Sequence, residues 1–169
     1  VARELKKRFS NCRITLIEKE HAVGLHASGR NSGVLHAGFY YSADSLKARF
    51  TKIGNQRLTE YCDHKKLKIR KCGKLVVAQN KNDLKWLDEL LARASKNGVV
   101  LKSISASEAL KIEPQVKTFQ RALFSPTTST VCPTEVTRSL AQDAIDEGIE
   151  IHTGVSYLRR SLDGIRTNC

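Results

Sequence analysis

The first twenty residues combine a short helix pattern, a turn and an apolar strand that ends in an acidic residue. Apolar side chains recur at helical spacing over residues 1–9, and Ser10 and Asn11 interrupt the pattern. The segment ITLIEKE (14–20) follows at once, with the β-branched residues typical of a strand and Glu18 near its end. A helix, a tight turn, a buried strand and a terminal acid form the second half of a dinucleotide-binding βαβ unit. We therefore predict an α/β fold.

A glycine loop normally opens the helix of such a unit, and an acidic residue about 20 positions later binds a ribose hydroxyl. Matching Ala2 and Leu5 to the usual helix positions places this glycine loop before Val1. We therefore expect the chain to lack the loop, and we expect both ends to cut through continuing structure. Because the helix N-terminus holds the pyrophosphate, we also expect the chain alone not to turn over a substrate.

Two helices are predicted after a glycine- and serine-rich loop at 21–41. The first spans about 45–64, and the second spans about 82–97, with Asn82 as its N-cap and Gly98 as its end. The first helix is indicated by an amphipathic pattern, in which apolar side chains recur every three to five residues: Leu46, Phe50, Ile53, Leu58 and Tyr61. The side chains expected to face inward on the second helix are Leu84, Leu87, Leu91 and Ala94.

The rest of the chain alternates short strands with helices. A third helix is predicted at about 134–147, between Pro133 at its start and Gly148 just past its end. The dipeptide Asp163-Gly164 predicts a hairpin. Strands are expected at 73–79, 99–104, 121–126 and 149–158, with a short helix at 105–114.

The net charge of +12 is concentrated in one part of the chain. Ten lysines and arginines lie between Lys47 and Lys74, against only two acids, Glu60 and Asp63. Such a surface attracts nucleic acid, an anionic membrane or an acidic substrate, while the simpler interpretation is a solvated helix face. Because no zinc-finger, ribonucleoprotein or basic-zipper motif accompanies the charge, we do not expect a nucleic-acid partner.

The five cysteines form no CxxC pair, and one is left over in any disulfide scheme. This count favours free thiols in a reducing interior, and we expect no metal site.

Three segments carry a resemblance to a known family: SGRNSGVLHAGFYY (28–41), SLKARFTKIGNQRLTEYC (45–62) and KKLKIRKCGKLVVA (65–78). They resemble the N-terminal third of the L-2-hydroxyglutarate dehydrogenases and oxidases, within the D-amino-acid-oxidase-like flavoprotein superfamily. The later stretch 124–158 resembles the superfamily's return from the substrate domain to the FAD domain.

The resemblance implies a partial FAD-binding Rossmann-like domain with an inserted α+β substrate domain. It implies FAD-binding segments at 1–44 and 131–169 and a substrate-domain portion at 45–130. The expected function of the complete parent is FAD-dependent oxidation of L-2-hydroxyglutarate to 2-oxoglutarate. The alternatives are another superfamily enzyme, such as a glycine or sarcosine oxidase or a glycerol-3-phosphate dehydrogenase, and a non-catalytic basic relic that binds polyanions.

Cofactor-binding residues are expected at three places. The position of Glu18 at a strand end predicts a carboxylate that accepts the ribose hydroxyls, although a surface acid is the alternative. The small residues of 27–33 let a backbone approach the pyrophosphate, unless this is only a surface loop. The resemblance adds Val155, otherwise a core valine, through its main chain. The other residues that it implies are Lys19, Ala27, Ser28, Arg30, Asn31, Ser32 and Gly33.

His36 is the expected catalytic base, since a histidine titrates near neutral pH and oxidation of a 2-hydroxy acid removes the hydroxyl proton. The resemblance places His36, Tyr40 and Tyr41 on the substrate side of the flavin, with Tyr40 as a second catalytic candidate. A histidine that is only packed or hydrogen-bonded to backbone is the alternative for His36. Most of the groups that bind the substrate carboxylates are expected beyond Cys169.

The expected partners are a small 2-hydroxy dicarboxylate and an electron acceptor, either a quinone-type molecule or oxygen. Peripheral membrane association is a further expectation from the resemblance. The location stays open between the cytoplasm or membrane of a bacterium and the mitochondrion of a eukaryote.

Overall fold

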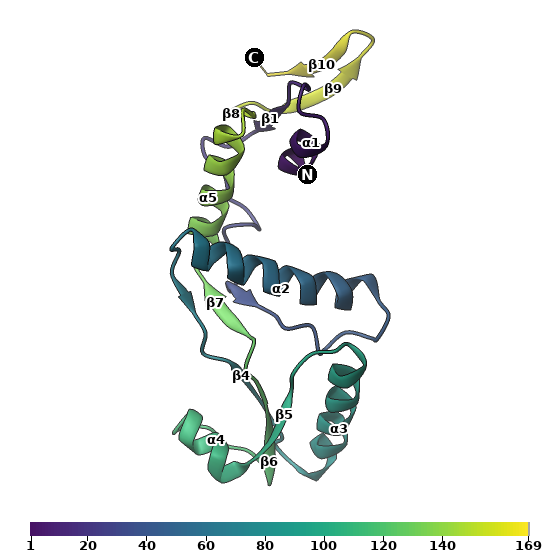
Figure 1. Cartoon of the computed structure of the whole chain (residues 1–169), viewed down its shortest axis with the longest axis vertical. Coiled ribbons are helices and arrows are strands. Elements are labelled where there is room, and N and C mark those ends of the chain that lie inside the picture. Colours follow the sequence, from purple (N-terminus) through teal and green to yellow (C-terminus); the bar gives the residue numbers. More distant parts are fainter. Residues whose placement is uncertain (169) are drawn as a thin grey trace. The chain divides into compact units, whose positions relative to one another are not determined.

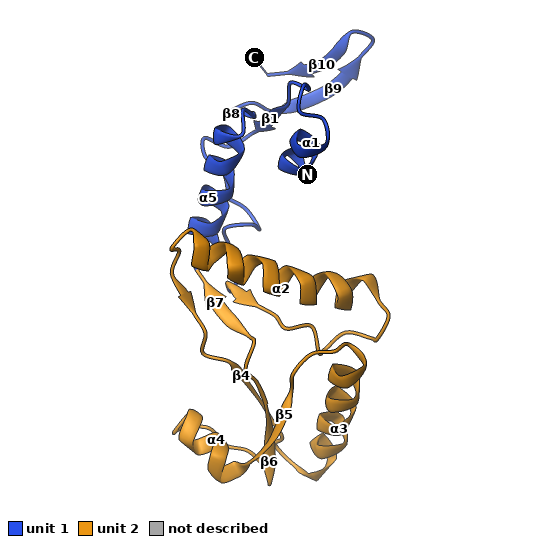
Figure 2. Ribbon diagram, in the orientation of Figure 1, with its two compact units in different colours: residues 1–32, 132–169 blue, residues 33–131 orange. Residues whose placement is uncertain are grey.

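The computed structural model describes residues 1–168 and divides into two compact units (Figure 2). Unit 1 comprises Val1–Ser32 and the chain from Cys132 onward, and unit 2 comprises Gly33–Val131. The chain thus leaves unit 1 once, builds unit 2 and returns. The division into FAD-binding segments at 1–44 and 131–169 and a substrate portion at 45–130 stays a prediction.

Unit 1 is organised around a parallel strand pair (Figure 1). Leu16 and Ile151 are opposite one another in this pair, as are Glu18 and Thr153. A separate antiparallel hairpin turns at Gly164. The elements are α1 (Ala2–Arg8), β1 (Thr15–Glu18), α5 (Pro133–Asp146), β8 (Glu150–Thr153), β9 (Tyr157–Ser161) and β10 (Gly164–Thr167), with β1 paired to β8 and β9 to β10.

Arg3 ties α1 to α5 through two carboxylates. Its guanidinium lies 3.2 Å from Asp143 and 2.6 Å from Glu147. Asp143 is only 7% exposed, so its charge requires a partner. The hydrogen bond from Arg3 lowers the pKa of Glu147, which keeps this carboxyl ionised. The first helix is therefore fixed to a helix more than a hundred residues away.

Unit 2 holds two three-stranded antiparallel sheets. In one, β7 (Ser129–Val131) lies between β2 (Val34–Leu35) and β3 (Ile69–Arg70); in the other, β6 (Arg121–Ser125) lies between β4 (Lys74–Val77) and β5 (Lys102–Ser105). The helices are α2 (Leu46–His64), α3 (Lys81–Lys96) and α4 (Ala106–Ile112).

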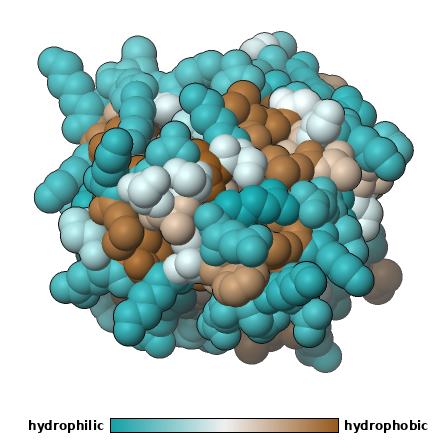
Figure 3. Space-filling model, turned by 90° about the horizontal axis from the view of Figure 1, so that it is seen from below, coloured by the Kyte–Doolittle hydropathy of each residue, from teal (hydrophilic) through white to brown (hydrophobic). Residues whose placement is uncertain are grey.

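The core of unit 2 forms where α3 covers one face of the second sheet (Figure 1). Leu87, Leu90 and Ala94 of α3 are buried against Val76 of β4 and Leu123 of β6. The predicted inward positions of this helix are thus confirmed at Leu87 and Ala94. Seen from below, apolar side chains also gather in separate patches between hydrophilic ones (Figure 3).

The apolar side chains that indicated α2 do not all lie on its buried side. Leu46 and Phe50 are 66% and 62% exposed, whereas Ala48 and Cys62 are the buried residues of this helix. The apolar spacing that predicted the helix was correct, but the helix presents a different side to its own unit. An apolar pattern identifies a helix face without specifying what covers it.

Two boundaries also differ from their predictions. The strand expected at 149–158 is two strands, because Gly154 adopts φ +74° and breaks the extended run. The strand expected at 99–104 begins only at Lys102, since Val99 still donates to the carbonyl of Ala94 and completes the end of α3.

The N-cap of α3 is Asn80 and not Asn82. The Asn80 side chain accepts from the Asn82 N–H at 2.9 Å, and Asp83 accepts in return from the backbone of Asn80. This reciprocal arrangement is a capping box.

We predict that Asn80→Ala lowers the free energy of unfolding by about 1 kcal/mol, the usual effect of losing an N-cap. Asn82→Ala is the matched control and leaves stability unchanged within about 0.5 kcal/mol, as expected of a surface change. Urea denaturation of the three chains measures both. An equal loss in the two variants would show that the cap has been assigned wrongly.

Candidate functional site

The carboxyl ends of β1 and β8 form the first part of the site. The Val155 N–H donates to the Glu18 carbonyl at 3.0 Å, and the Gly154 N–H donates to the Glu20 carbonyl at 2.8 Å. The structure therefore brings Glu18 and Val155 together, although 137 positions separate them in the sequence (155 − 18). Ligands of parallel α/β sheets bind at this end of the strands.

The Glu18 side chain lines a hollow of about 390 Å³. Apolar residues of α1, β1 and α5 form most of its wall, among them Ala2, Leu16 and Ala141. One Glu18 oxygen accepts from the Glu20 N–H at 3.0 Å. Its other oxygen has no hydrogen-bond partner in residues 1–168, so it is available to accept from a ligand hydroxyl.

Lys19 and His26 both approach Glu20. The Lys19 ammonium is 3.9 Å from Glu20 Oε1, and His26 Nε2 is 2.7 Å from the same atom. The hydrogen bond with His26 lowers the pKa of Glu20. These contacts fix the start of the loop beside the strand end, while Lys19 itself stays exposed.

The loop at 26–31 is held by its own backbone and by α5. The His26 carbonyl accepts from the N–H groups of Gly29 and Arg30, and Thr134 of α5 donates to the Gly29 carbonyl at 3.3 Å. A Cβ at Gly29 would stand 1.9 Å from the Gly24 carbonyl oxygen, so only glycine fits. The loop is therefore a packed turn and not an open chain.

The remaining cofactor candidates differ in their surroundings. Arg30 is exposed and forms no ion pair with the described side chains. The Asn31 amide donates to the carbonyls of Ala27 and Ser28, so its NH₂ group braces the loop. Gly33 is buried at φ +66°, and its carbonyl accepts from Val131. The exposed members of the loop are Ala27, Ser28, Arg30, Asn31 and Ser32.

Unit 2 contains the two catalytic candidates, His36 and Tyr40. Burial and the nearby charge of Lys74 lower the pKa of His36. Tyr40 is half-buried between Phe39 and Trp86, with ring centroids at 4.3 and 6.2 Å. The Lys74 ammonium lies 4.7 Å from the centre of the Tyr40 ring. Lys74 thus contacts the ring of Tyr40 and acts electrostatically on His36. The sequence did not predict this role for Lys74.

The end of α3 fixes the backbone that carries Tyr40. The Asn97 side chain donates to the carbonyls of Gly38 and Tyr41 at 3.2 and 3.0 Å, and Arg93 donates to the Tyr40 carbonyl at 3.3 Å. Asn97 was not a sequence candidate. Its only signal was an amide next to the helix-ending Gly98, a position that usually serves the helix itself.

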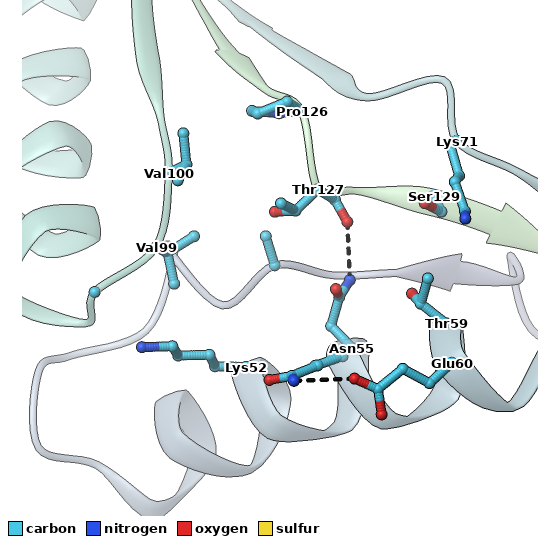
Figure 4. Close-up of a pocket in the computed structure, with 13 residues that line it drawn as sticks. Lys52, Asn55, Thr59, Glu60, Lys71, Val99, Val100, Pro126, Thr127 and Ser129 are labelled. Carbon is cyan, nitrogen blue, oxygen red and sulfur yellow. Dashed lines mark hydrogen bonds between the residues drawn. The ribbon is translucent and has the colours of Figure 1, made fainter.

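A larger hollow of about 470 Å³ lies between α2 and the 126–129 turn (Figure 4). Several of its polar groups have partners within the fold. Asn55 donates to the carbonyls of Leu35 and Thr127, Glu60 accepts from Gln56, and Lys71 pairs with Asp63. The amide of Asn55 thereby joins α2 to β2 and to the 126–129 turn, which is a structural role.

Comparison with known families identifies the class to which this arrangement belongs. The model of the FAD dependent oxidoreductase family matches residues 1–168. The chain belongs to this family.

Within this family, the chain is similar to several L-2-hydroxyglutarate dehydrogenases. The chain is 35% identical to the mitochondrial L-2-hydroxyglutarate dehydrogenase of Dictyostelium discoideum, over 86% of this chain and 33% of the relative. It is 34% identical to the L-2-hydroxyglutarate dehydrogenase of Escherichia coli K12, over 97% of this chain and 39% of the relative. It is 35% identical to the mitochondrial L-2-hydroxyglutarate dehydrogenase of Pongo abelii, over 98% of this chain and 42% of the relative. The chain thus spans between a third and about two fifths of these relatives.

Solved structures share the Rossmann-like fold. The L-α-glycerophosphate oxidase of Mycoplasma pneumoniae with FAD bound superposes with a TM-score of 0.81 and 26% identity, over 91% of this chain and 43% of that one. The L-proline dehydrogenase of P. horikoshii superposes with a TM-score of 0.86 and 23% identity, over 99% of this chain and 45% of that one.

The residues of unit 1 fit the cofactor of this family. Glu18 offers a carboxylate oxygen at the strand ends beside an apolar hollow, as the ribose of a dinucleotide requires. The packed loop exposes small residues and the unpaired cation of Arg30, which suits a pyrophosphate.

We predict that Gly29→Ala destabilises the chain by about 1–3 kcal/mol, because the new methyl group overpacks against the Gly24 carbonyl. Gly54→Ala is the matched control, since a Cβ there meets no atom within 4 Å and Gly54 lies inside α2. It should stabilise by roughly 0.5–1 kcal/mol through helix propensity. Thermal unfolding measures both, and a neutral Gly29→Ala would contradict the packed-loop description.

Proposed function

We propose that this chain belongs to an FAD-dependent dehydrogenase that oxidises L-2-hydroxyglutarate to 2-oxoglutarate. The observation that carries the proposal is the 34–35% identity to three enzymes so named, over 86–98% of the chain. Unit 1 would bind the adenosine end of FAD through Glu18 and Val155. The loop 27–33, with Arg30, would face its pyrophosphate, and Lys19 the adenine.

His36 is the proposed base in unit 2. When bound, FAD accepts the two electrons and the hydrogen that leave the alpha carbon. The His36 imidazole takes the proton from the substrate hydroxyl, and its lowered pKa keeps this ring neutral and able to accept it at pH 7. Tyr40 is fixed by its backbone contacts to Arg93 and by its aromatic neighbours, so it would present a rigid wall and hydroxyl to the substrate.

The electron acceptor and the location belong to the same proposal. We propose a quinone-type acceptor or oxygen, with a mitochondrial location in a eukaryotic cell, as the names of the Dictyostelium discoideum and Pongo abelii relatives indicate. In a bacterium, the proposed location is the cytoplasm or its membrane surface. None of the helices within residues 1–168 combines the length and apolarity needed to cross a bilayer.

The test is a chimera in which this chain replaces the matching segment of the Escherichia coli relative. We expect the chimera to retain bound FAD and to reduce an electron-accepting dye with L-2-hydroxyglutarate. His36→Asn should lower kcat by about 100-fold or more, the effect of losing a general base, without loss of FAD. His64→Asn, an exposed histidine at the end of α2, is the control.

Two outcomes would contradict the proposal. A flavin-loaded chimera that oxidises glycine, sarcosine or glycerol 3-phosphate in place of L-2-hydroxyglutarate would favour another member of the superfamily. A His36→Asn variant with unchanged kcat would remove His36 from the reaction.

One observation favours an additional membrane-binding role. The outer face of α2, defined by Leu46, Lys47, Arg49, Phe50 and Arg57, combines two exposed apolar side chains with three cations. No acid lies between Leu46 and Thr59. Apolar residues flanked by cations suit the surface of an anionic bilayer, into which Leu and Phe insert while Lys and Arg meet the lipid headgroups.

We predict that the chain binds phosphatidylglycerol vesicles and not phosphatidylcholine vesicles in sedimentation assays. Leu46→Ser with Phe50→Ser should weaken this binding by about tenfold or more, because each buried apolar side chain contributes roughly 1.5–3 kcal/mol. Leu110→Ser with Ile112→Ser, exposed on α4, is the control. Tight RNA binding that the α2 variant leaves unchanged would instead support the polyanion alternative.

A further inference from the structure

The register of the two sheets brings Lys74 close to His36. The Gly73 N–H donates to the Thr128 carbonyl at 3.0 Å, immediately before Lys74 begins β4. One residue further along, Ser129 pairs with Leu35, and His36 directly follows that pair. Lys74, the first residue of β4, and His36, which directly follows β2, thus both lie next to the segment 128–129.

The side chain of Lys74 is half-buried and has no anionic partner. Its ammonium lies over the Tyr40 ring at 4.7 Å, and no carboxylate within residues 1–168 is within ion-pair distance of it. A cation–π contact compensates a partly desolvated ammonium only in part. Other cations of unit 2 do have acids: Lys71 pairs with Asp63, Arg93 with Glu89 and Arg121 with Asp88.

The charge of Lys74 reaches His36. Partial desolvation is the larger cause of the lowered His36 pKa, and the positive charge of Lys74 lowers it further. An anion beside His36 would neutralise that charge and hydrogen-bond to the ammonium. The Tyr40 ring, held by α3, restricts where the ammonium can point.

We propose that Lys74 binds a carboxylate of the substrate, beside His36 and Tyr40. This inference rests on the proposed function, because it supplies one of the two carboxylate ligands that a hydroxy dicarboxylate requires. Lys74 then has a second role. Its charge keeps the base neutral until the substrate arrives, and the bound carboxylate then makes His36 more basic as it takes the hydroxyl proton.

The test measures ligand binding to the 169-residue chain through the fluorescence of its single tryptophan, Trp86. The centroid of the Trp86 ring is 6.2 Å from that of the Tyr40 ring, so this fluorescence reports on the neighbourhood of Tyr40. We expect L-2-hydroxyglutarate to bind the unmodified chain. Lys74→Met should lower the affinity for L-2-hydroxyglutarate by about tenfold or more, the usual effect of losing a charge-assisted hydrogen bond. Lys74→Arg should retain most of this affinity. Lys102→Met is the control, because Lys102 is an exposed lysine at the start of β5 that has no proposed role.

Proton NMR of His36 gives a second readout that a purely structural lysine would not move. Lys74→Met should raise the pKa of His36, since the repelling charge is gone. Addition of L-2-hydroxyglutarate should raise the pKa of His36 in the unmodified chain and leave this pKa unchanged in Lys74→Met.

The outcomes separate the two proposals. Equal binding of L-2-hydroxyglutarate to the unmodified chain and to Lys74→Met overturns the role of Lys74 and leaves the function in place. Lys74-dependent binding of inorganic phosphate or glycerol 3-phosphate, without binding of L-2-hydroxyglutarate, supports an anion site and contradicts the proposed substrate. Absence of binding by all three anions overturns the anion site.

Discussion

The parallel pairing of β1 with β8 is the contact on which the rest of unit 1 depends. It joins Thr15 to Glu150, 135 positions apart, and it aligns Glu18 with Val155 at the strand ends. Two strands of four residues are too short to be stable alone, so they need the helices that pack on them. Arg3 supplies part of this packing by joining α1 to α5. The carboxylate at the strand end therefore owes its position to contacts made by residues at both ends of the chain.

Much of the secondary structure could be predicted from local patterns. The α1, α3 and α5 helices and the hairpin at Gly164 agree with their predicted positions, because spacing, caps and turn residues are properties of neighbouring residues. The strands β2, β3 and β7 were not predicted. They have two or three residues each and exist only because distant segments pair, which no local pattern records.

The same distinction applies to the site. Glu18 could be proposed as a candidate from the sequence because a strand end is a local feature. The proximity of His36, Tyr40 and Lys74 could not be predicted from the sequence. It follows from the register of β2 with β7 and of β4 with β6. Likewise, the amide of Asn97 reads as a helix end in the sequence, and only the folded chain shows it holding the backbone around Tyr40.

The hydrogen bond from the Val131 N–H to the Gly33 carbonyl, at 2.9 Å, makes unit 2 a closed module. Its first and last residues, Gly33 and Val131, are hydrogen-bonded neighbours, so the chain enters and leaves this unit at one place. Insertions are tolerated where the two ends of a segment meet in this way. A chain built on this plan can exchange the inserted unit while the strand pair that carries Glu18 stays unchanged.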